Sequence, residues 1–212
     1  MFEDPNTELS PIHFFTLQAD CHSLLKAKDN PDMTKHLLPL TKDLTREESF
    51  ANVAMGWHPE GLAFQIQVSE KHTQSFYPNL EKGDSIELWI DTRDVKTSGF
   101  NTRFCHHFFF LPVLIDGIDK GEITHFRTED SHPLCDEKLL LSKVTMKKNG
   151  YHIQIFIPSQ CLYGYDPNQF DRLGFTYRIN RAEGEPQHFA VISPDFQIEQ
   201  QPSLWGSLKM VK

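Results

Sequence analysis

The sequence lacks the patterns that define several large classes of protein. No apolar run approaches the roughly 20 residues needed to span a bilayer, so we expect no membrane insertion. Basic residues are few: 21 Lys and Arg against 29 Asp and Glu give a net charge of -8, with no basic stripe. Such a surface repels phosphate backbones, and we expect no nucleic-acid partner. Residues 1–11 have no signal-peptide pattern, so the chain as given is expected to be cytoplasmic.

Closely spaced cysteines and catalytic motifs are also missing. The four cysteines, Cys21, Cys105, Cys135 and Cys161, are far apart and form no C-x-x-C pair. We therefore expect reduced, mostly buried thiols, with a disulfide framework as the alternative. The sequence contains no G-x-S-x-G elbow, no H-E-x-x-H and no glycine-rich phosphate loop. Because such patterns position a nucleophile, a metal or a phosphate, their absence predicts a protein that is not an enzyme.

Helical periodicity is scarce as well, whereas apolar residues recur at every second position through much of the chain. The 17 Phe favour strands, because aromatic side chains suit pleated, half-buried surfaces. Thr45 and Glu48 fit a capping box for a short helix, and residues 159–163 fit one helical turn. A turn at 58–61 and another at Asn149-Gly150 join two hairpins. Strands are predicted where the two-residue period holds, at residues 51–57, 62–68, 85–91, 103–113, 139–147, 151–157, 173–180, 187–192 and 204–211.

These short strands, bounded by turns, predict one all-β domain, an antiparallel β-sandwich of the jelly-roll or immunoglobulin-like kind. We assign it to residues 1–212, with 50–212 as its core and 1–49 as a less defined N-terminal segment. Residues 19–44 and 116–138 show no pattern that assigns a structure. The second stretch is long for a loop, and long loops on rigid scaffolds are common places for binding.

Five segments occur in the order known from one protein family. Residues 82–91, K-G-D-S-I-E-L-W-I-D, resemble the D-S-V-E-I-F-I-D strand of family 9 carbohydrate-binding modules, which belong to the DOMON-like group of β-sandwiches. Four further segments agree with the family in order. Residues 51–68 resemble its hairpin, and residues 150–158 resemble its G-Y to I-P strand. Residues 173–181 resemble its strand ending in V-N-D, and residues 205–209 resemble its closing F/W-G-x-L strand. Residues 91–94 and 103–108 also resemble a bacterial subgroup of family-9-like proteins. The resemblance implies the same sandwich over residues 50–212.

The resemblance also implies sugar binding, although part of the family's sugar site is missing. The family holds a terminal sugar between two tryptophan rings while polar side chains contact its hydroxyls. At the two tryptophan positions this chain has Leu80 or Glu81 and the segment 194–196, so the clamp is absent. Three polar residues resemble family site residues. Together with the nearest aromatic residues they form the predicted ligand site: Tyr77, Glu87, Trp89, Arg103, Asn180 and Phe196.

Each of these residues has a simpler interpretation. Glu87 is on the polar face of an alternating strand, where solvated or cross-strand-paired acids are common. Arg103 could be its structural partner, and Asn180 an ordinary turn residue. Trp89 shares the face of Glu87 and is either a stacking platform or buried beneath a loop. We hypothesise a non-catalytic module with a degenerate sugar site that binds a carbohydrate or another polar small molecule. The alternatives are a protein-interaction or accessory domain, and a metal- or haem-binding DOMON-like domain.

Metal ligands are abundant but not arranged in a known motif. Cys105, His107, His132 and Cys135 have the right chemistry for zinc, yet their spacing fits no zinc finger or ribbon. Hydrogen-bonded histidines in a Phe-rich layer are the alternative. Haem is suggested only by other DOMON-like proteins. We expect no resident cofactor, with structural calcium as an alternative that carboxylates in turns would hold, here Asp91, Asp94, Asp116 and Asp119.

Overall fold

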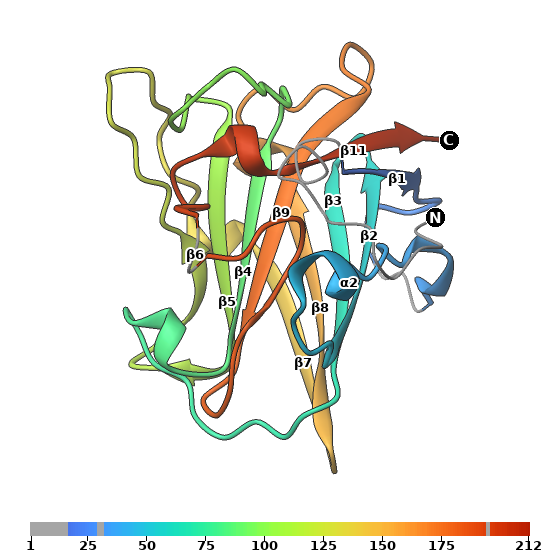
Figure 1. Ribbon diagram of the computed structural model, residues 1–212. Coiled ribbons are helices and arrows are strands. Elements are labelled where there is room, and N and C mark those ends of the chain that lie inside the picture. Colours follow the sequence, from blue (N-terminus) through green and yellow to red (C-terminus); the bar gives the residue numbers. More distant parts are fainter. Residues whose placement is uncertain (1–16, 29–31, 194–195) are drawn as a thin grey trace.

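The computed structural model describes residues 17–28, 32–193 and 196–212, and almost all regular structure in them is β-strand (Figure 1). The strands are β1 (Gln18–Ser23), β2 (Ala51–His58), β3 (Gly61–Val68), β4 (Ser85–Asp91), β5 (Cys105–Ile115), β6 (Ile118–Glu122), β7 (Leu141–Lys147), β8 (Gly150–Pro158), β9 (Arg172–Asn180), β10 (Gln187–His188) and β11 (Gly206–Val211). The helical elements are single turns: η1 (Thr34–His36), α2 (Lys42–Thr45), η2 (Leu80–Lys82), η3 (Glu137–Leu139), η4 (Ser159–Cys161) and η5 (Pro202–Leu204). The predicted all-β class is confirmed.

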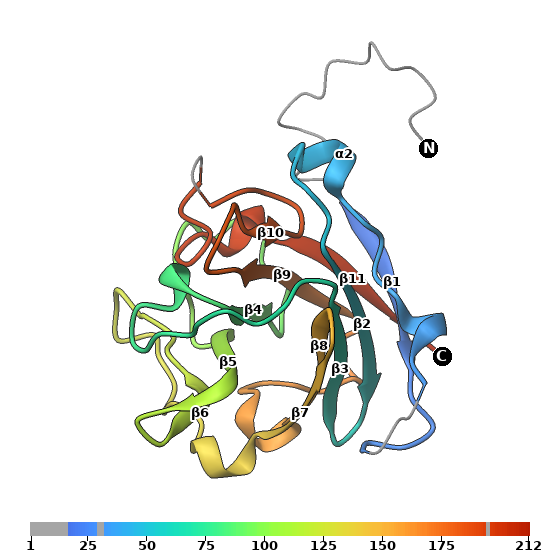
Figure 2. The same ribbon diagram turned by 90° about the horizontal axis from the view of Figure 1, so that it is seen from below.

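Hydrogen bonds join the strands into one sheet in the order β6-β5-β4-β9-β11-β1-β2-β3-β8-β7, with β10 paired to β9. Most pairs are antiparallel, but β1 runs parallel to both β11 and β2. The sheet curls until its two end strands, β6 and β7, approach each other (Figure 2). The hydrogen-bonding pattern thus defines one nearly closed sheet, and the predicted division into two sandwich sheets stays a prediction.

The core fills the inside of this curled sheet. Alternation on β4 sends Ile86, Leu88 and Ile90 inward, where they join the main hydrophobic cluster with Phe108 of β5 and Phe175 of β9. Burying each such side chain stabilises the fold by about 1.5–3 kcal/mol. The outward-pointing residues of β4 are buried too, because loops cover that face. A second set of buried side chains therefore exists outside the main core.

Two predicted local elements differ from the structure. The strand predicted at 187–192 ends at His188, because Ala190 has a φ of 75°, which breaks the extended backbone. The predicted capping box is wrong: Thr45 ends α2, and Arg46 follows in the left-handed conformation. Glu48 instead pairs with Arg181. In the described residues, no helix has the length and apolar composition that a membrane span requires.

Two strands were not predicted. β1 is mostly exposed and polar, and it is held by β11 from the other end of the chain. β6 contains Asp119, Lys120 and Gly121 among its five residues, so it shows no apolar alternation. β1 is stabilised by long-range pairing, and β6 by its hairpin with the apolar strand β5, so the residues of neither strand display the pattern by themselves.

The cysteines follow the prediction only in part. Cys21 and Cys105 are free and buried, as expected, but Cys135 and Cys161 form a disulfide. The bond joins the loop after β6 to η4, elements that lie on opposite sides of the gap between β6 and β7. The disulfide contradicts the prediction that all four cysteines are reduced thiols. Disulfides are typical of oxidising compartments.

Candidate functional site

A row of side chains crosses three neighbouring strands on the outer face of the sheet. On β4, Glu87 and Trp89 alternate with core residues and point away from the main core. In the strand register, Glu87 lies between Phe109 of β5 and Arg178 of β9, and Trp89 lies opposite His107. Because directly opposite side chains in an antiparallel pair share a face, these residues form one continuous patch.

Glu87 is the centre of this patch, and three side chains contact its carboxylate. Arg178 Nε donates to Oε1 at 2.8 Å, and Asn180 Nδ2 donates to the same oxygen at 2.8 Å. His107 Nε2 lies 3.0 Å from Oε2. Only 2% of Glu87 is exposed. We call these four residues, Glu87, His107, Arg178 and Asn180, the Glu87 cluster.

Opposing effects act on the pKa of Glu87. Burial raises it, because the ionised carboxylate loses its hydration. The hydrogen bond from His107 and the charge interactions with His107 and Arg178 outweigh burial and lower the pKa to about 2. Glu87 is therefore ionised at neutral pH and is paired with a guanidinium that stays charged. The cluster reaches the surface through Arg178, whose Nη1 lies 2.9 Å from Oε1 of the partly exposed Glu199.

Trp89 is sealed beneath a loop. None of its surface is exposed, and it packs with Trp205 and neighbouring apolar residues of the chain after β10. Its ring stacks on His107 with 4.2 Å between the centroids. Phe196, another predicted site residue, packs against the same cluster. Of the two alternatives for Trp89, the structure shows burial, so this ring is not a platform for a ligand in this conformation.

Tyr77 lies at another edge of the outer face, on the ring of Phe109. The two ring centroids are 5.3 Å apart and the planes differ by 26°. Gly121 of β6 lies opposite Phe109, and a Cβ at that position would come within 2.8 Å of the Phe109 ring. The glycine therefore lets the ring pack closely against β6. Both aromatic rings line an open hollow of about 280 Å³ that extends over β6 to Cys135 and Glu137.

Arg103 is not part of this patch. It forms an ion pair with Asp130, and 46% of its side chain is exposed. In the register of β4 and β5, Cys105 lies opposite Asp91, four residues or about 13 Å along β4 from Glu87. Arg103 lies beyond that end of β5. The structure therefore does not bring Arg103 to Glu87, and another arginine takes the position beside the carboxylate.

Sequence reasoning missed Arg178 and Phe109. Arg178 shares a strand face with Thr176 and Asn180 on a strand that was predicted correctly, so its position on the polar face could have been read from the two-residue period. Phe109 could not have been identified in this way, because β5 is apolar on both faces and nothing in the local sequence distinguishes its outer residues. Strand register, which decides the neighbours of Glu87, is not visible in the sequence.

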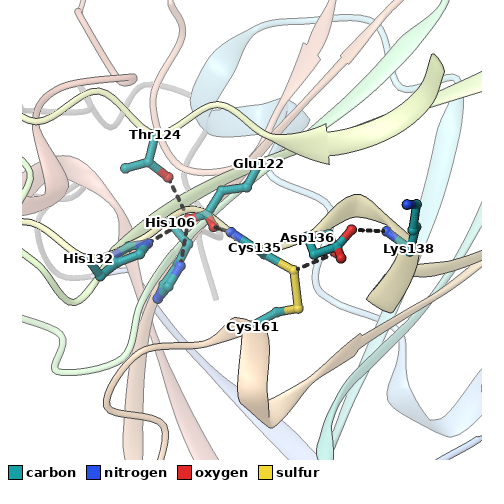
Figure 3. The surroundings of a disulfide bond; sticks show 8 residues. All are labelled: His106, Glu122, Thr124, His132, Cys135, Asp136, Lys138 and Cys161. Carbon is teal, nitrogen blue, oxygen red and sulfur yellow. Dashed lines mark hydrogen bonds and ion pairs between the residues drawn. A yellow bond between two sulfur atoms is a disulfide. The ribbon is translucent and has the colours of Figure 1, made fainter.

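The four residues considered as zinc ligands, Cys105, His107, His132 and Cys135, do not form one site. Cys135 is bonded to Cys161 (Figure 3), so its sulfur is not a thiolate ligand. His107 belongs to the Glu87 cluster. Burial raises the pKa of Cys105 to about 12, which keeps it a thiol. His132 lies in a different cluster, inside the curled sheet. The predicted set is thus divided among separate places in the fold.

The four acids considered for calcium lie in two places. Asp91 ends β4 and accepts two backbone N–H groups of the following turn, in which Asp94 pairs with Lys96 at 2.7 Å. Asp116 and Asp119 lie at and just after the β5–β6 turn, at the other end of β5. The structure does not bring all four together, and a structural calcium ion stays a prediction.

Comparison with known proteins gives one relative in sequence and several in structure. No protein-family model matches the chain. The exoglucanase XynX of Acetivibrio thermocellus is 25% identical over 134 residues, which is 63% of this chain but only 10% of that enzyme. The chain thus corresponds to a small part of the length of this relative.

Two of the structural neighbours are family 9 carbohydrate-binding modules. A family 9 module from Caldicellulosiruptor kristjanssonii in complex with glucose superposes with a TM-score of 0.65 at 13% identity, over 92% of this chain and 95% of that one. A family 9 module from the same organism in complex with cellotriose gives a TM-score of 0.63, also at 13% identity, over 91% and 93%. At this identity the likeness is one of fold. The chain has the fold of the family 9 carbohydrate-binding modules, as its five sequence segments predicted.

Proposed function

We propose that this domain is a non-catalytic carbohydrate-binding module with a degenerate form of the family's sugar site. The Glu87 cluster is the observation that carries the proposal, because it holds a guanidinium, an amide and a carboxylate in fixed positions on the outer face. Sugar hydroxyls both donate and accept, so they are recognised by such pre-positioned groups. The likeness in fold to modules solved with glucose and cellotriose supports this ligand class.

Tyr77 would provide the aromatic surface in place of the missing tryptophans, because its ring is partly exposed and stacks on Phe109, which is only 2% exposed. Phe109 lies directly beside Glu87 in the register, and Tyr77 stacks on it at the edge of an open hollow. The C–H face of a sugar ring packs on a flat aromatic surface while its hydroxyls turn toward polar neighbours. One aromatic wall instead of a two-sided clamp means weaker binding, and we expect dissociation constants on the order of 1 mM.

A protein-interaction or accessory role is the second candidate. It is favoured by the burial of Trp89 and by the way in which Glu87 is already satisfied by its three partners. In this alternative the Glu87 cluster is a structural ion pair that holds β4, β5 and β9 in register, and it contacts no ligand.

Calorimetric titration with glucose and cellotriose, together with a glycan array, distinguishes the two candidates. The variant Arg178→Gln removes the surface-reaching charge of the cluster, and Arg172→Gln is the matched control, an exposed arginine on the same strand. Losing a charge-assisted hydrogen bond of about 1.5–3 kcal/mol predicts a tenfold or greater loss of sugar affinity in Arg178→Gln. Circular dichroism would check that both variants fold.

Two results would overturn the proposal. If the wild-type domain binds no sugar on the array or at millimolar concentration in the calorimeter, the accessory role replaces it. If Arg178→Gln and Arg172→Gln bind a sugar equally well, the sugar site lies elsewhere on the domain.

A further inference from the structure

Inside the curled sheet, two histidines converge on one buried carboxylate. His106 Nδ1 lies 2.8 Å and His132 Nε2 lies 2.9 Å from Oε1 of Glu122. Figure 3 shows the two rings in contact with this carboxylate. The three side chains are almost completely shielded from solvent. Their ligating atoms all lie within 4.8 Å of one another. We call His106, Glu122 and His132 the histidine–glutamate cluster.

The fold brings these residues together from three separate segments. His106 precedes the core residue Phe108 by two positions on β5 and so points inward, and Glu122 ends β6 opposite Phe108. His132 comes from the loop between β6 and η3, which the disulfide of Cys135 fixes to η4. The cluster therefore lies on the inner face of the sheet, whereas the adjacent His107 points to the outer face and the Glu87 cluster.

A hydrogen bond at the edge of the cluster determines which ring nitrogen of His132 carries a hydrogen. His132 Nδ1 lies 2.7 Å from the carbonyl oxygen of Arg103, which can only accept, so this nitrogen carries a hydrogen. In a neutral ring, Nε2 then presents its lone pair to the Glu122 oxygen. Two lone pairs repel, so this geometry requires a cation between them, either a proton or a metal ion.

The carboxylate is held in the way that metal ligands are usually held. Thr124 Oγ1 donates to Glu122 Oε1 at 2.8 Å, and the backbone N–H of Cys135 donates to Oε2 at 2.7 Å. Ligand histidines characteristically donate their other ring nitrogen to a carbonyl, as His132 does, and ligand carboxylates are themselves hydrogen-bonded. The second nitrogen of His106, Nε2, is buried and has no partner of hydrogen-bonding geometry, although the carbonyl of Tyr163 faces that ring.

We propose that His106 Nδ1, His132 Nε2 and Glu122 Oε1 bind a divalent transition-metal ion of the zinc class. Two imidazole nitrogens and one carboxylate oxygen are a typical zinc donor set that leaves one position for water. Tetrahedral ligands at about 2.0 Å from zinc are roughly 3.3 Å apart. The two imidazoles therefore need to move outward from the carboxylate by about 0.5 Å, and their two nitrogens, which lie within 4.8 Å of each other, need to reach a similar separation of roughly 3.3 Å. A metal ion and water would reach the site from the open hollow of about 290 Å³ beside the disulfide, which His132 lines.

Metal content and zinc titration test this site in the intact domain. After dialysis against a chelator, titration with zinc chloride should show one ion per chain and a rise in thermal midpoint, since binding to the folded state alone stabilises it. His132→Gln should weaken zinc binding at least tenfold. His125→Gln, an exposed histidine of the same loop, should leave it unchanged. Arg178→Gln should also leave zinc binding unchanged, which separates this site from the proposed sugar site.

A second measurement needs no variant and remains decisive if His132→Gln does not fold. In the wild-type domain, nitrogen chemical shifts of the imidazoles should show zinc on Nδ1 of His106 and on Nε2 of His132. The proposal is overturned if zinc changes neither the thermal midpoint nor these shifts. It is also overturned if His132→Gln and His125→Gln bind zinc equally, which would mark adventitious binding to surface histidines.

Discussion

Replacing Glu87 with glutamine should change how the stability of the domain depends on pH. The pKa of Glu87 is lowered from 4.5 to about 2 in the folded protein. Each pKa unit corresponds to about 1.4 kcal/mol, so the ionised Glu87 contributes on the order of 3 kcal/mol. A carboxylate with a depressed folded pKa stabilises above its unfolded pKa and loses that contribution as the pH falls toward the folded value. The window is therefore about pH 4.5 down to 2.

The assay is denaturant unfolding followed by tryptophan fluorescence at several pH values between 7 and 2. At pH 7, Glu87→Gln should be about 3 kcal/mol less stable than the wild type, because the buried charge of Arg178 loses its partner. The difference should shrink toward zero near pH 2. Other carboxylates titrate in both proteins, so the difference between the curves isolates Glu87. Glu48→Gln is the control, since 70% of that side chain is exposed and its effect should stay within about 0.5 kcal/mol.

The reasoning is refuted if the stability curves of wild type and Glu87→Gln run parallel across this window. Parallel curves would mean that the pKa of Glu87 is the same in the folded and unfolded states. The close contacts with His107, Arg178 and Asn180 would then have no net effect on its ionisation.

Two further predictions concern buried structure. Trp89→Ala should destabilise the domain by about 3–5 kcal/mol, measured by denaturant unfolding, because Trp89 is fully buried against Trp205; a loss below about 1 kcal/mol would show that the ring is at the surface. The double variant Cys135→Ser, Cys161→Ser should have a free energy of unfolding about 3 kcal/mol lower than the wild type, because the disulfide closes a loop of 26 residues. Unchanged stability of this variant, or a wild type whose stability does not change on adding reductant, would contradict the bond.

Local sequence patterns determined most strands of this protein. The hairpin of β2 and β3 and the strand β4 alternate between apolar and polar or small residues, and this two-residue period fits an extended backbone. The Asn149-Gly150 signal correctly predicted a tight turn between β7 and β8, but Gly150 already pairs with Lys147 and neither Asn149 nor Gly150 has the positive φ on which that prediction was based. These features depend on neighbours within a few residues, so they can be read without the fold.

Long-range pairing determined the remainder of the fold. β1 is a strand because β11 and β2 flank it, and its own polar residues do not indicate one. The left-handed Ala190 that ends β10 has no marker in the sequence, since alanine rarely adopts that conformation. The pairing of Cys135 with Cys161 depends on the closeness of the loop after β6 to η4, which spacing along the chain does not reveal.

The two clusters show the same division. The sequence by itself placed Glu87 on a polar strand face, and the family resemblance marked Glu87 and Asn180 as site residues. Only the register of β4 with β5 and β9 decided that Arg178, and not Arg103, lies beside Glu87. The convergence of His106, Glu122 and His132 required the pairing of β5 with β6 and the return of the loop after β6 to the same face. Alternation determines which face a side chain occupies, but the tertiary structure decides what it meets there, because that partner is supplied by distant segments of the chain.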